Sequence, residues 1–360
     1  MTMAGGLGAD PATLTLRDWA PRSQVSADEH LVQRAAVRCV DVHNHLGRWL
    51  AEDSSWMTPD VGAVLDILDA CNVATVVNLD GRWGNELREN IERYDAAHSG
   101  RFVTFAHLDW SLLADPGGIA GVDRLVRSVA DSAAAGARGL KVWKDLGLSF
   151  RDEHGELVLP DAPQVGAVLE AAGEHGLPVL IHTADPVAFF DPLDRHNERL
   201  EELARCPDWW FGRAGLPTFA RLMVALESAV ASHPATTFIG AHVGCYVEDL
   251  RWVDRMLTTY SNFHVDIGGR VPELGRQPRA FRRLVETHPD QVLFGTDGYP
   301  LDAATYATSF RFVETEDESF PYAPGEAVAP TGRWDISGAG LPGALLDGFY
   351  AGNATRLLGL

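Results

Sequence analysis

Residues 39–48 read CVDVHNHLGR, an apolar run that ends in two histidines separated by a single residue. In an extended strand the side chains at positions i, i+2 and i+4 share a face, so we expect Asp41, His43 and His45 to converge on one side. One interpretation is the polar, solvent-facing side of an edge strand. The other is a metal site, because imidazole is the commonest metal ligand in proteins. The rest of the chain must decide between the two.

Seven further short apolar runs follow the first, with helix-like segments between them. They predict strands at 38–43, 73–79, 101–107, 138–143, 178–182, 237–242, 263–267 and 291–296. The clearest helical patterns lie at 59–71, 119–136, 163–176 and 219–233. Eight strands separated by helices predict an α/β protein, a parallel sheet closed into a (β/α)8 TIM barrel. A doubly wound open sheet is the alternative, but no glycine-rich phosphate turn follows the first strand.

The segment before the first predicted strand and two of the connections between elements are longer than a barrel requires. We expect residues 1–37 to form an N-terminal extension and residues 38–360 to form a single barrel domain. Residues 183–217 follow the fifth strand, and residues 298–345 follow the eighth. Both leave from the carboxyl ends of strands, where barrel active sites lie, so they are expected to be lids or binding loops.

The composition is acidic, with 30 Lys and Arg against 50 Asp and Glu and a formal charge of −20. This charge argues against nucleic acid and anionic membranes as partners. Four scattered cysteines without a C-x-x-C pair fit a reducing compartment. The start of the chain lacks a signal-peptide pattern, and no apolar run approaches the roughly 20 residues of a membrane helix. We therefore expect a cytoplasmic protein with a small-molecule substrate.

Five of the predicted strands end in residues that bind metals or carry protons. The carboxyl ends of barrel strands meet at one mouth, so these side chains are expected to converge. Each alone has an ordinary structural explanation, whereas their joint placement favours a catalytic metal site. The residues are His43 and His45 on the first strand, Lys141 on the fourth, His182 on the fifth, His242 on the sixth and Asp297 after the eighth.

The segments at these strand ends are DVHNH, GLKVW, LIHTAD, GAHVG and LFGTDGYP, and YAGNATRLLGL closes the chain. Together they resemble the amidohydrolase superfamily of metal-dependent barrels, and most closely its amidohydrolase 2 branch. That branch also contains aminocarboxymuconate-semialdehyde decarboxylase-type enzymes. The resemblance runs from about residue 38 to the C-terminus, and it carries little information on the substrate.

The resemblance implies a role for each of the strand-end residues. His43 and His45 would ligate the first metal, and Asp297 would be a ligand or the general base. His182 and His242 would bind a second metal, or one would bind the first metal while the other polarises the substrate. Donors of this type suit Zn²⁺, Mn²⁺ or Fe²⁺.

Lys141 bears on the number of metals. In binuclear members of the superfamily, a lysine ending the fourth strand is carbamylated by carbon dioxide and bridges two metals. An ammonium cannot ligate a cation, whereas the carbamate is an anionic oxygen donor. The alternatives are a cation that binds a substrate carboxylate, or an ion pair with Asp297. Decarboxylases of this branch usually use one metal and no bridge, so Lys141 slightly favours hydrolysis.

The expected function is a metal-dependent hydrolase that cleaves an amide, ester, lactone or thioester bond of a small organic substrate by a metal-activated water. Asp297 would take the proton of the water, and the metal, with His242, would stabilise the oxyanion. The alternative is a metal-dependent, non-oxidative decarboxylase, a lyase acting on an aromatic or enoic acid. A binding module without activity is disfavoured by the intact set of strand-end residues.

Weaker candidates surround this set. Asp41 is expected to orient a ligand imidazole or to cap a buried polar network. Substrate contact is expected from His107, Trp143 and Arg270, and Trp110 and Asp266 face the same mouth. An aromatic lid is predicted from Trp143, Trp209, Trp210, Tyr322 and Trp334, although Trp209 and Trp210 would alternatively pack a loop helix. Members of the branch are often dimers, so a homodimer is an arrangement that the resemblance suggests.

Overall fold

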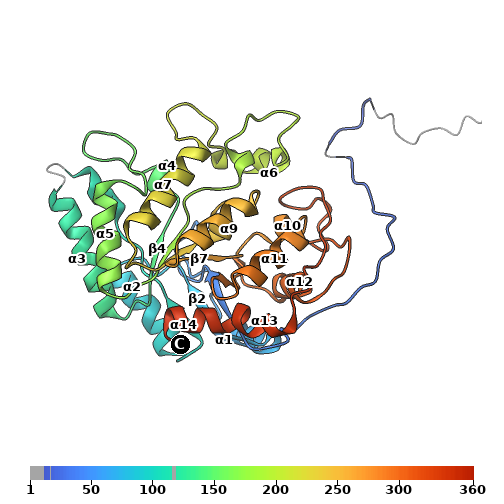
Figure 1. Ribbon diagram of the computed structural model, residues 1–360, viewed down its shortest axis with the longest axis horizontal. Coiled ribbons are helices and arrows are strands. Elements are labelled where there is room, and N and C mark those ends of the chain that lie inside the picture. The colour runs from blue at the N-terminus through green and yellow to red at the C-terminus, as the bar shows by residue number, and fades with distance from the viewer. Residues whose placement is uncertain (1–11, 17, 116–118) are drawn as a thin grey trace, which may run out of the picture.

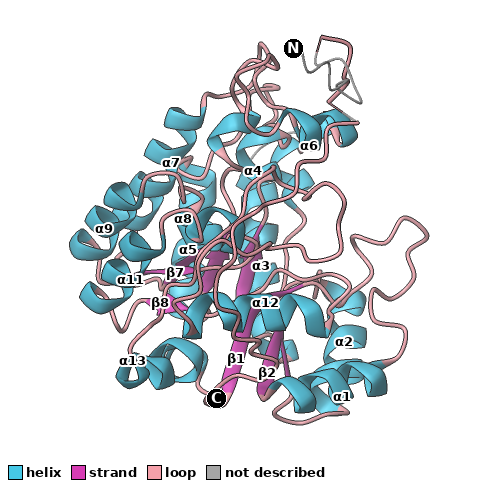
Figure 2. Ribbon diagram, turned by 90° about the vertical axis from the view of Figure 1, so that its right-hand side faces the viewer, coloured by secondary structure: helices cyan, strands magenta, loops and turns pink. Residues whose placement is uncertain are grey.

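A computed structural model describes residues 12–16, 18–115 and 119–360. Parallel strands lie at its centre and helices surround them (Figure 1, Figure 2). The strands are β1 (Cys39–Asn44), β2 (Val73–Asn78), β3 (Phe102–Thr104), β4 (Leu140–Val142), β5 (Val179–Ile181), β6 (Phe238–Gly240), β7 (Phe263–Asp266) and β8 (Val292–Leu293). Each predicted strand overlaps one of these, so the predicted alternation of strand and helix is confirmed.

The longer helices of the described chain pack around the strands. They are α1 (Val61–Cys71), α2 (Gly84–Ile91), α3 (Ile119–Ala135), α5 (Pro163–Glu174), α7 (Phe219–Ser232), α9 (Leu250–Thr259), α11 (Pro278–Thr287) and α12 (Ala303–Glu314). Shorter helices are α4 (Asp145–Leu148), α6 (Leu200–Arg205), α8 (Ala241–Gly244), α10 (Val271–Leu274), α13 (Gly343–Asp347) and α14 (Asn353–Leu358). None of the helices in the described ranges is both long and apolar enough to cross a membrane.

The strands close into a barrel. Strands β1 to β3 form one hydrogen-bonded sheet, and β4 to β8 form another. A bridge between Ala106 and Leu140 joins β3 to β4. On the other side, the Val42 amide donates to the Phe294 carbonyl at 3.1 Å and joins β1 to β8. The predicted TIM barrel is therefore confirmed.

The barrel interior is filled by every second residue of the strands, as the pleat requires. Its core contains Val40, Val42, Val77, Leu79, Val103, Phe105, Leu180, Ile239 and Leu293. Leu358 of α14 joins this cluster, so the last helix covers the amino-terminal end of the barrel. A larger apolar layer lies between the strands and the outer helices. The carboxyl ends of the strands form the opposite end of the barrel, which α14 does not cover, and polar residues lie there.

The two long connections are more structured than the sequence predicted. The connection after β8 contains the barrel helix α12, which begins after Asp302; the Asp302 carboxylate accepts from the amides of Ala304 and Thr305 at 2.7 and 2.9 Å. The connection after β5 contains the short helix α6 and two 3-10 helices, Val187–Phe189 and Pro207–Trp209. Arg199, just before α6, is buried, so the segment is packed against its neighbours although it carries many charged residues.

The described residues before β1 form neither a helix nor a strand. They run outward beyond the barrel on the side of α12 (Figure 1). The His30 amide donates to Asp317 at 2.8 Å, and Arg333 donates to the Leu16 carbonyl at 2.8 Å. Both partners belong to the connection after β8. The division into an extension of residues 1–37 and one barrel domain stays a prediction.

Candidate active site

The end of β1 positions the first two histidines. The strand shifts register between Asp41 and Asn44, so its side chains do not alternate regularly there. Val40 and Val42 point into the barrel core, whereas Asp41 points outward and accepts from the Tyr306 hydroxyl of α12 at 2.9 Å. The expectation that Asp41 shares a face with the histidines is therefore wrong. Of the two roles considered for it, the buried polar network is the one observed.

His43 and His45 each donate a hydrogen bond from one ring nitrogen to a buried carboxylate. The His43 Nδ1 lies 3.0 Å from Asp266 Oδ2, and the His45 Nδ1 lies 2.7 Å from Asp80 Oδ1. Because a carboxylate only accepts, both rings carry the proton on Nδ1 and present Nε2. This is the arrangement in which outer carboxylates orient metal-ligating histidines. Asp266 was expected to face the substrate, but it is fully buried behind His43.

Asp297 lies opposite the two free imidazole nitrogens. Its Oδ1 is 3.3 Å from His45 Nε2 and 3.6 Å from His43 Nε2. Its backbone amide donates to the His43 carbonyl at 2.8 Å, which ties the end of β8 to β1. The residue has a left-handed backbone conformation, with a φ of 55°. Such strained conformations cluster at functional sites, and here it turns the carboxylate toward the histidines.

Asp297 and His45 carry opposite charges in this group. Burial raises the pKa of Asp297, but the imidazoles of His43 and His45 outweigh it and hold that pKa well below its usual range. Burial lowers the pKa of His45, yet the carboxylates of Asp80 and Asp297 raise it to about 9. Without a metal, His45 is thus a cation beside an ionised Asp297. A metal cation at the same place would replace that proton.

His242 adds a third imidazole. Its ring centroid lies 4.6 Å from that of His43, and its Nδ1 donates to the Gly268 carbonyl at 2.7 Å. Burial lowers the pKa of His242 well below its usual value, so the ring is neutral. With the proton on Nδ1, Nε2 carries a lone pair. This favours His242 as a metal ligand or proton acceptor over a hydrogen-bond donor to an oxyanion.

His182 is held differently from the other histidines. Its Nε2 donates to Asp185 Oδ1 at 3.1 Å, and Asp185 Oδ2 accepts from Lys144 Nζ at 2.5 Å. Its Nδ1 is buried and has no hydrogen-bond partner among the described residues. Burial lowers the pKa of His182 to about 3, so the free nitrogen is a lone pair. The ring lies 4.4 Å from that of His242.

Lys141 lies beside the free nitrogen of His43, with its Nζ 3.4 Å from His43 Nε2. The side chain is buried and passes over the ring of Trp143 at 5.0 Å. Burial lowers the pKa of Lys141 to about 8, although Asp297 and Asp266 oppose the shift. A pKa near 8 leaves a fraction of neutral amine at neutral pH. The neutral amine is the form that reacts with carbon dioxide, so the position is compatible with a carbamate as well as with a cation.

Two groups of donor atoms in the described chain are compact enough to hold an ion. His43, His45 and Asp297 form one group, and His43, His242 and Asp266 form the other, each with its ligand atoms within 4.8 Å of one another. Asp266 is already engaged by His43 and by the Gly268 amide at 2.8 Å. The first group therefore has the freer donors. Two imidazole nitrogens and a carboxylate fit Zn²⁺, Mn²⁺ or Fe²⁺.

A cavity of about 580 Å³ opens over these donors. It lies at the carboxyl ends of the strands, and its wall includes His182, His242 and Asp297. Of the three residues expected to contact substrate, Trp143 and Arg270 line it. His107 lines a smaller pocket beside it.

Only part of the predicted aromatic lid covers this cavity. Trp209 lines it together with Trp143. Trp210 instead donates to the Asp191 carbonyl at 2.8 Å, and Trp334 donates to the Pro272 carbonyl at 3.0 Å. Tyr322 faces another hollow.

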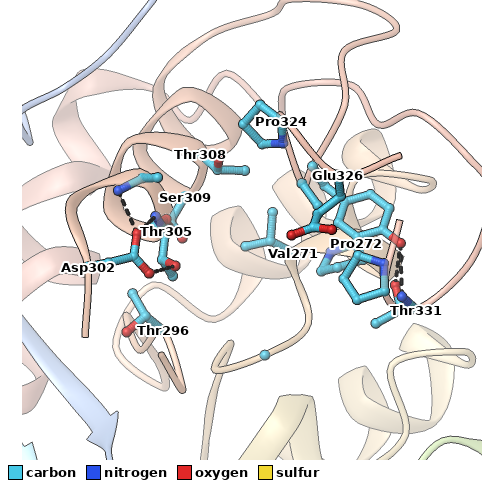
Figure 3. A pocket seen from close by; sticks show the side chains of 15 residues that line it. Val271, Pro272, Thr296, Asp302, Thr305, Thr308, Ser309, Pro324, Glu326 and Thr331 are labelled. Carbon is cyan, nitrogen blue, oxygen red and sulfur yellow. Dashed lines mark hydrogen bonds between the residues drawn. The ribbon is translucent and has the colours of Figure 1, made fainter. Parts of the chain in front are cut away.

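That other hollow, of about 360 Å³, is bordered by Thr296 and α12 (Figure 3). Two of its polar groups already have partners: Asp302 caps α12, and the Tyr322 hydroxyl accepts from the Thr331 amide at 3.1 Å. Because the imidazoles and Asp297 face the larger cavity, that cavity is the candidate active site.

Sequence reasoning missed Asp80, Asp185 and Lys144. Asp80 lies two residues beyond β2, Asp185 follows β5 by four residues, and Lys144 follows β4 by two. Acids just beyond strand ends are a detectable signal in a barrel, because that face holds the site. Their pairing with particular imidazoles depends on loop conformation.

Comparisons with known proteins show the family of the chain. A sequence profile described as "Amidohydrolase" matches residues 40–360. The chain belongs to the amidohydrolase family. Among curated proteins, none matches it.

Several solved structures share the fold of the chain. A 2,6-dihydroxybenzoate decarboxylase from Rhizobium is 17% identical, with a TM-score of 0.54 over 90% of this chain and 99% of its own. A dihydroxybenzoic acid decarboxylase from Polaromonas, with bound manganese and an inhibitor, is 15% identical, with a TM-score of 0.54 over 90% and 97%. An amidohydrolase from Burkholderia multivorans with bound zinc is 13% identical, with a TM-score of 0.54 over 90% and 100%. At these identities the likeness establishes the barrel fold.

Proposed function

We propose that the chain is a metal-dependent hydrolase that cleaves an amide, ester, lactone or thioester bond of a small organic substrate. The observation that carries this proposal is the position of Asp297, which lines the cavity and lies 3.6 Å from His43 Nε2 and 3.3 Å from His45 Nε2. His43, His45 and Asp297 would hold a divalent ion, with His242 as a further donor. Such an ion would supply Lewis acidity, which lowers the pKa of a bound water from 15.7 to about 7.

Side chains of the cavity would provide proton transfer and substrate binding. Asp297 is ionised and its side chain is 21% exposed, whereas the imidazoles of His43 and His45 are almost fully buried. It is therefore the group positioned to take a proton from water in the cavity and return it to the leaving group. Trp143 and Trp209 offer apolar surface to an acyl or aryl group, and Arg270 offers a cation.

Replacing Asp297 tests this assignment. Asp297→Asn keeps the size of the side chain but removes its ability to accept a proton, so we expect hydrolysis to fall about 10²–10⁴-fold. The measurement is turnover of a panel of esters, lactones, thioesters and amides in ¹⁸O-labelled water. Label in the acid product supports hydrolysis. Full activity in the variant would contradict the role of Asp297.

Lys141 would either be carbamylated and bridge a second metal, with His182 and His242 as its other donors, or remain a cation that binds the substrate. Lys141→Met separates the two, because methionine can neither bridge metals nor carry charge. For a bridge, we expect bound metal to fall from two equivalents to one or fewer. For a cation, we expect bound metal to stay at one equivalent while the KM for an anionic substrate rises. Elemental analysis and steady-state kinetics measure both.

Decarboxylation of an aromatic or enoic acid is the second candidate. It is favoured by the position of His182, which lies outside both compact donor groups and so leaves a site suited to one metal. Two of the similar structures described above are also named decarboxylases. Lys141, with a pKa of about 8, would be a suitable acid to protonate the carbon. Release of carbon dioxide without uptake of labelled oxygen would favour this function.

A further inference from the structure

Two tryptophans divide the mouth of the barrel into two compartments. Trp49 follows β1 and Trp143 follows β4, and their rings meet edge to face at 4.7 Å and 89°. Both side chains line the large cavity on one side and a pocket of about 230 Å³ on the other. The large cavity lies over the later strands. The smaller one, here called the side pocket, is lined by residues that follow β1 to β4.

The side pocket combines a guanidinium with aromatic surfaces. The Arg82 guanidinium lies over the Trp83 ring at 4.2 Å and 5.5 Å from the Trp49 ring. Within the described chain, the Arg82 ion pair that the structure shows joins its Nε to Glu86 Oε2 at 4.0 Å, the outer limit of such a contact. Lys141 also lines the pocket and is buried. A guanidinium beside indole faces is suited to a flat, negatively charged ligand, which stacks on the rings and bonds to the guanidinium.

Two carboxylates also line the pocket, but each is engaged elsewhere. Asp109 accepts from the Ser111 hydroxyl at 2.5 Å and from the Ser111 amide at 3.2 Å. Asp145 accepts from the Ser149 hydroxyl at 3.2 Å. Neither forms an ion pair with Arg82 within 4.0 Å. The donors of Arg82 are therefore left for a ligand.

We propose that the side pocket is a second binding site, separate from the large cavity, for a planar organic carboxylate. Its volume lies below the roughly 300–1,000 Å³ of pockets for drug-sized ligands, so a single-ring acid is the expected size. The carboxylate would pair with Arg82, as guanidinium groups do in bidentate geometry, and the ring would lie against Trp49 and Trp83. The proposal does not depend on the reaction proposed above.

Benzoate is the simplest probe of this site. We expect saturable, one-to-one binding of benzoate to the full-length protein, measured by calorimetry and by the change in tryptophan fluorescence. Benzamide has the same shape without the charge, and acetate has the charge without the ring. Both are expected to bind at least about tenfold more weakly, because each loses one of the two kinds of contact. Equal binding of benzoate, benzamide and acetate, or no binding of benzoate, would overturn the proposal.

Matched arginine variants locate the bound benzoate. Arg82→Gln should weaken benzoate binding at least about tenfold, whereas Arg270→Gln, in the large cavity, should change it less than about twofold. Arg82→Lys keeps the charge but loses the bidentate fork, so its affinity should lie between those of the wild type and Arg82→Gln, which separates loss of charge from a failure to fold. If Arg270→Gln weakens binding and Arg82→Gln does not, benzoate occupies the large cavity and the side pocket is not its site.

Discussion

Two imidazole–carboxylate pairs stand on opposite sides of the barrel mouth and expose opposite ring nitrogens. On the side of β1, Asp80 holds the Nδ1 of His45 and leaves Nε2 free toward Asp297. On the side of β5, Asp185 holds the Nε2 of His182 and leaves Nδ1 buried without a partner. His45 belongs to a compact donor group, and His182 does not. The outer carboxylate thus determines which nitrogen is presented, and the surrounding strands determine whether other donors meet it.

The largest effect should follow from removing the imidazole on the β1 side. His45→Ala deletes one donor of the compact group, and a bound metal supplies several kcal/mol of transition-state stabilisation. We expect turnover to fall by roughly 10³-fold or more. His196→Ala, which removes an exposed histidine, is the control and should leave turnover unchanged. A His45→Ala enzyme with near-normal turnover would mean that β1 does not carry the site.

Exchanging the two outer carboxylates for amides compares the pairs directly. Asp80→Asn should weaken metal affinity about 10–100-fold, because the amide no longer holds His45 in its ligating tautomer. Asp185→Asn should change metal affinity less than about threefold, since His182 lies outside the compact group. Competition with a chromogenic chelator measures both constants. A larger loss in Asp185→Asn would show that His182 is a ligand through its free nitrogen, and the comparison would be reversed.

A histidine on β7 gives a smaller, pH-dependent effect on stability. His264 has no carboxylate partner among the described residues, and burial lowers its pKa to about 4. The unfolded chain, with a histidine pKa near 6.5, therefore binds the proton first as the pH falls. The contribution of His264 to the free energy of unfolding is constant above pH 6.5. Between about pH 6.5 and 4 the free energy of unfolding falls on its account by at most about 3 kcal/mol.

His264→Gln removes this proton-binding step. The free energy of unfolding, measured by urea titration at pH 7.5 and 4.5, should fall less in the variant than in the wild type. Other buried histidines contribute equally to both proteins, so the difference isolates His264. The same drop in both would contradict neutral burial of this residue.

The fold was predictable because its signals are local. Buried parallel strands appear as short apolar runs, such as 178–182 and 237–242, and the barrel follows from their number. The strand-end histidines were found for the same reason, since the end of a run is visible in the sequence. Helix α12 was missed although Asp302 is a strong N-cap, because the charged and glycine-rich residues beyond it made the whole connection resemble a loop.

The failures concern features that depend on contacts between distant segments. The register shift in β1 turned Asp41 toward α12, and strict alternation cannot foresee a bulge. The pairing of His43 with Asp266 joins residues 223 positions apart. The Trp49–Trp143 partition depends on the conformations of two loops. Such contacts follow from the assembled barrel, and no spacing within one segment encodes them.

Metal content per chain tests the central claim, that His43, His45 and Asp297 hold a divalent ion. The measurement is elemental analysis of full-length protein, purified without a histidine tag or chelator and supplied with Zn²⁺, Mn²⁺ or Fe²⁺. We predict at least one equivalent of metal per wild-type chain and less than about a tenth of that in His45→Ala, because tetrahedral sites of this kind need at least three protein donors. A wild-type chain that binds none of these ions, or a His45→Ala chain with its full complement, would contradict the account.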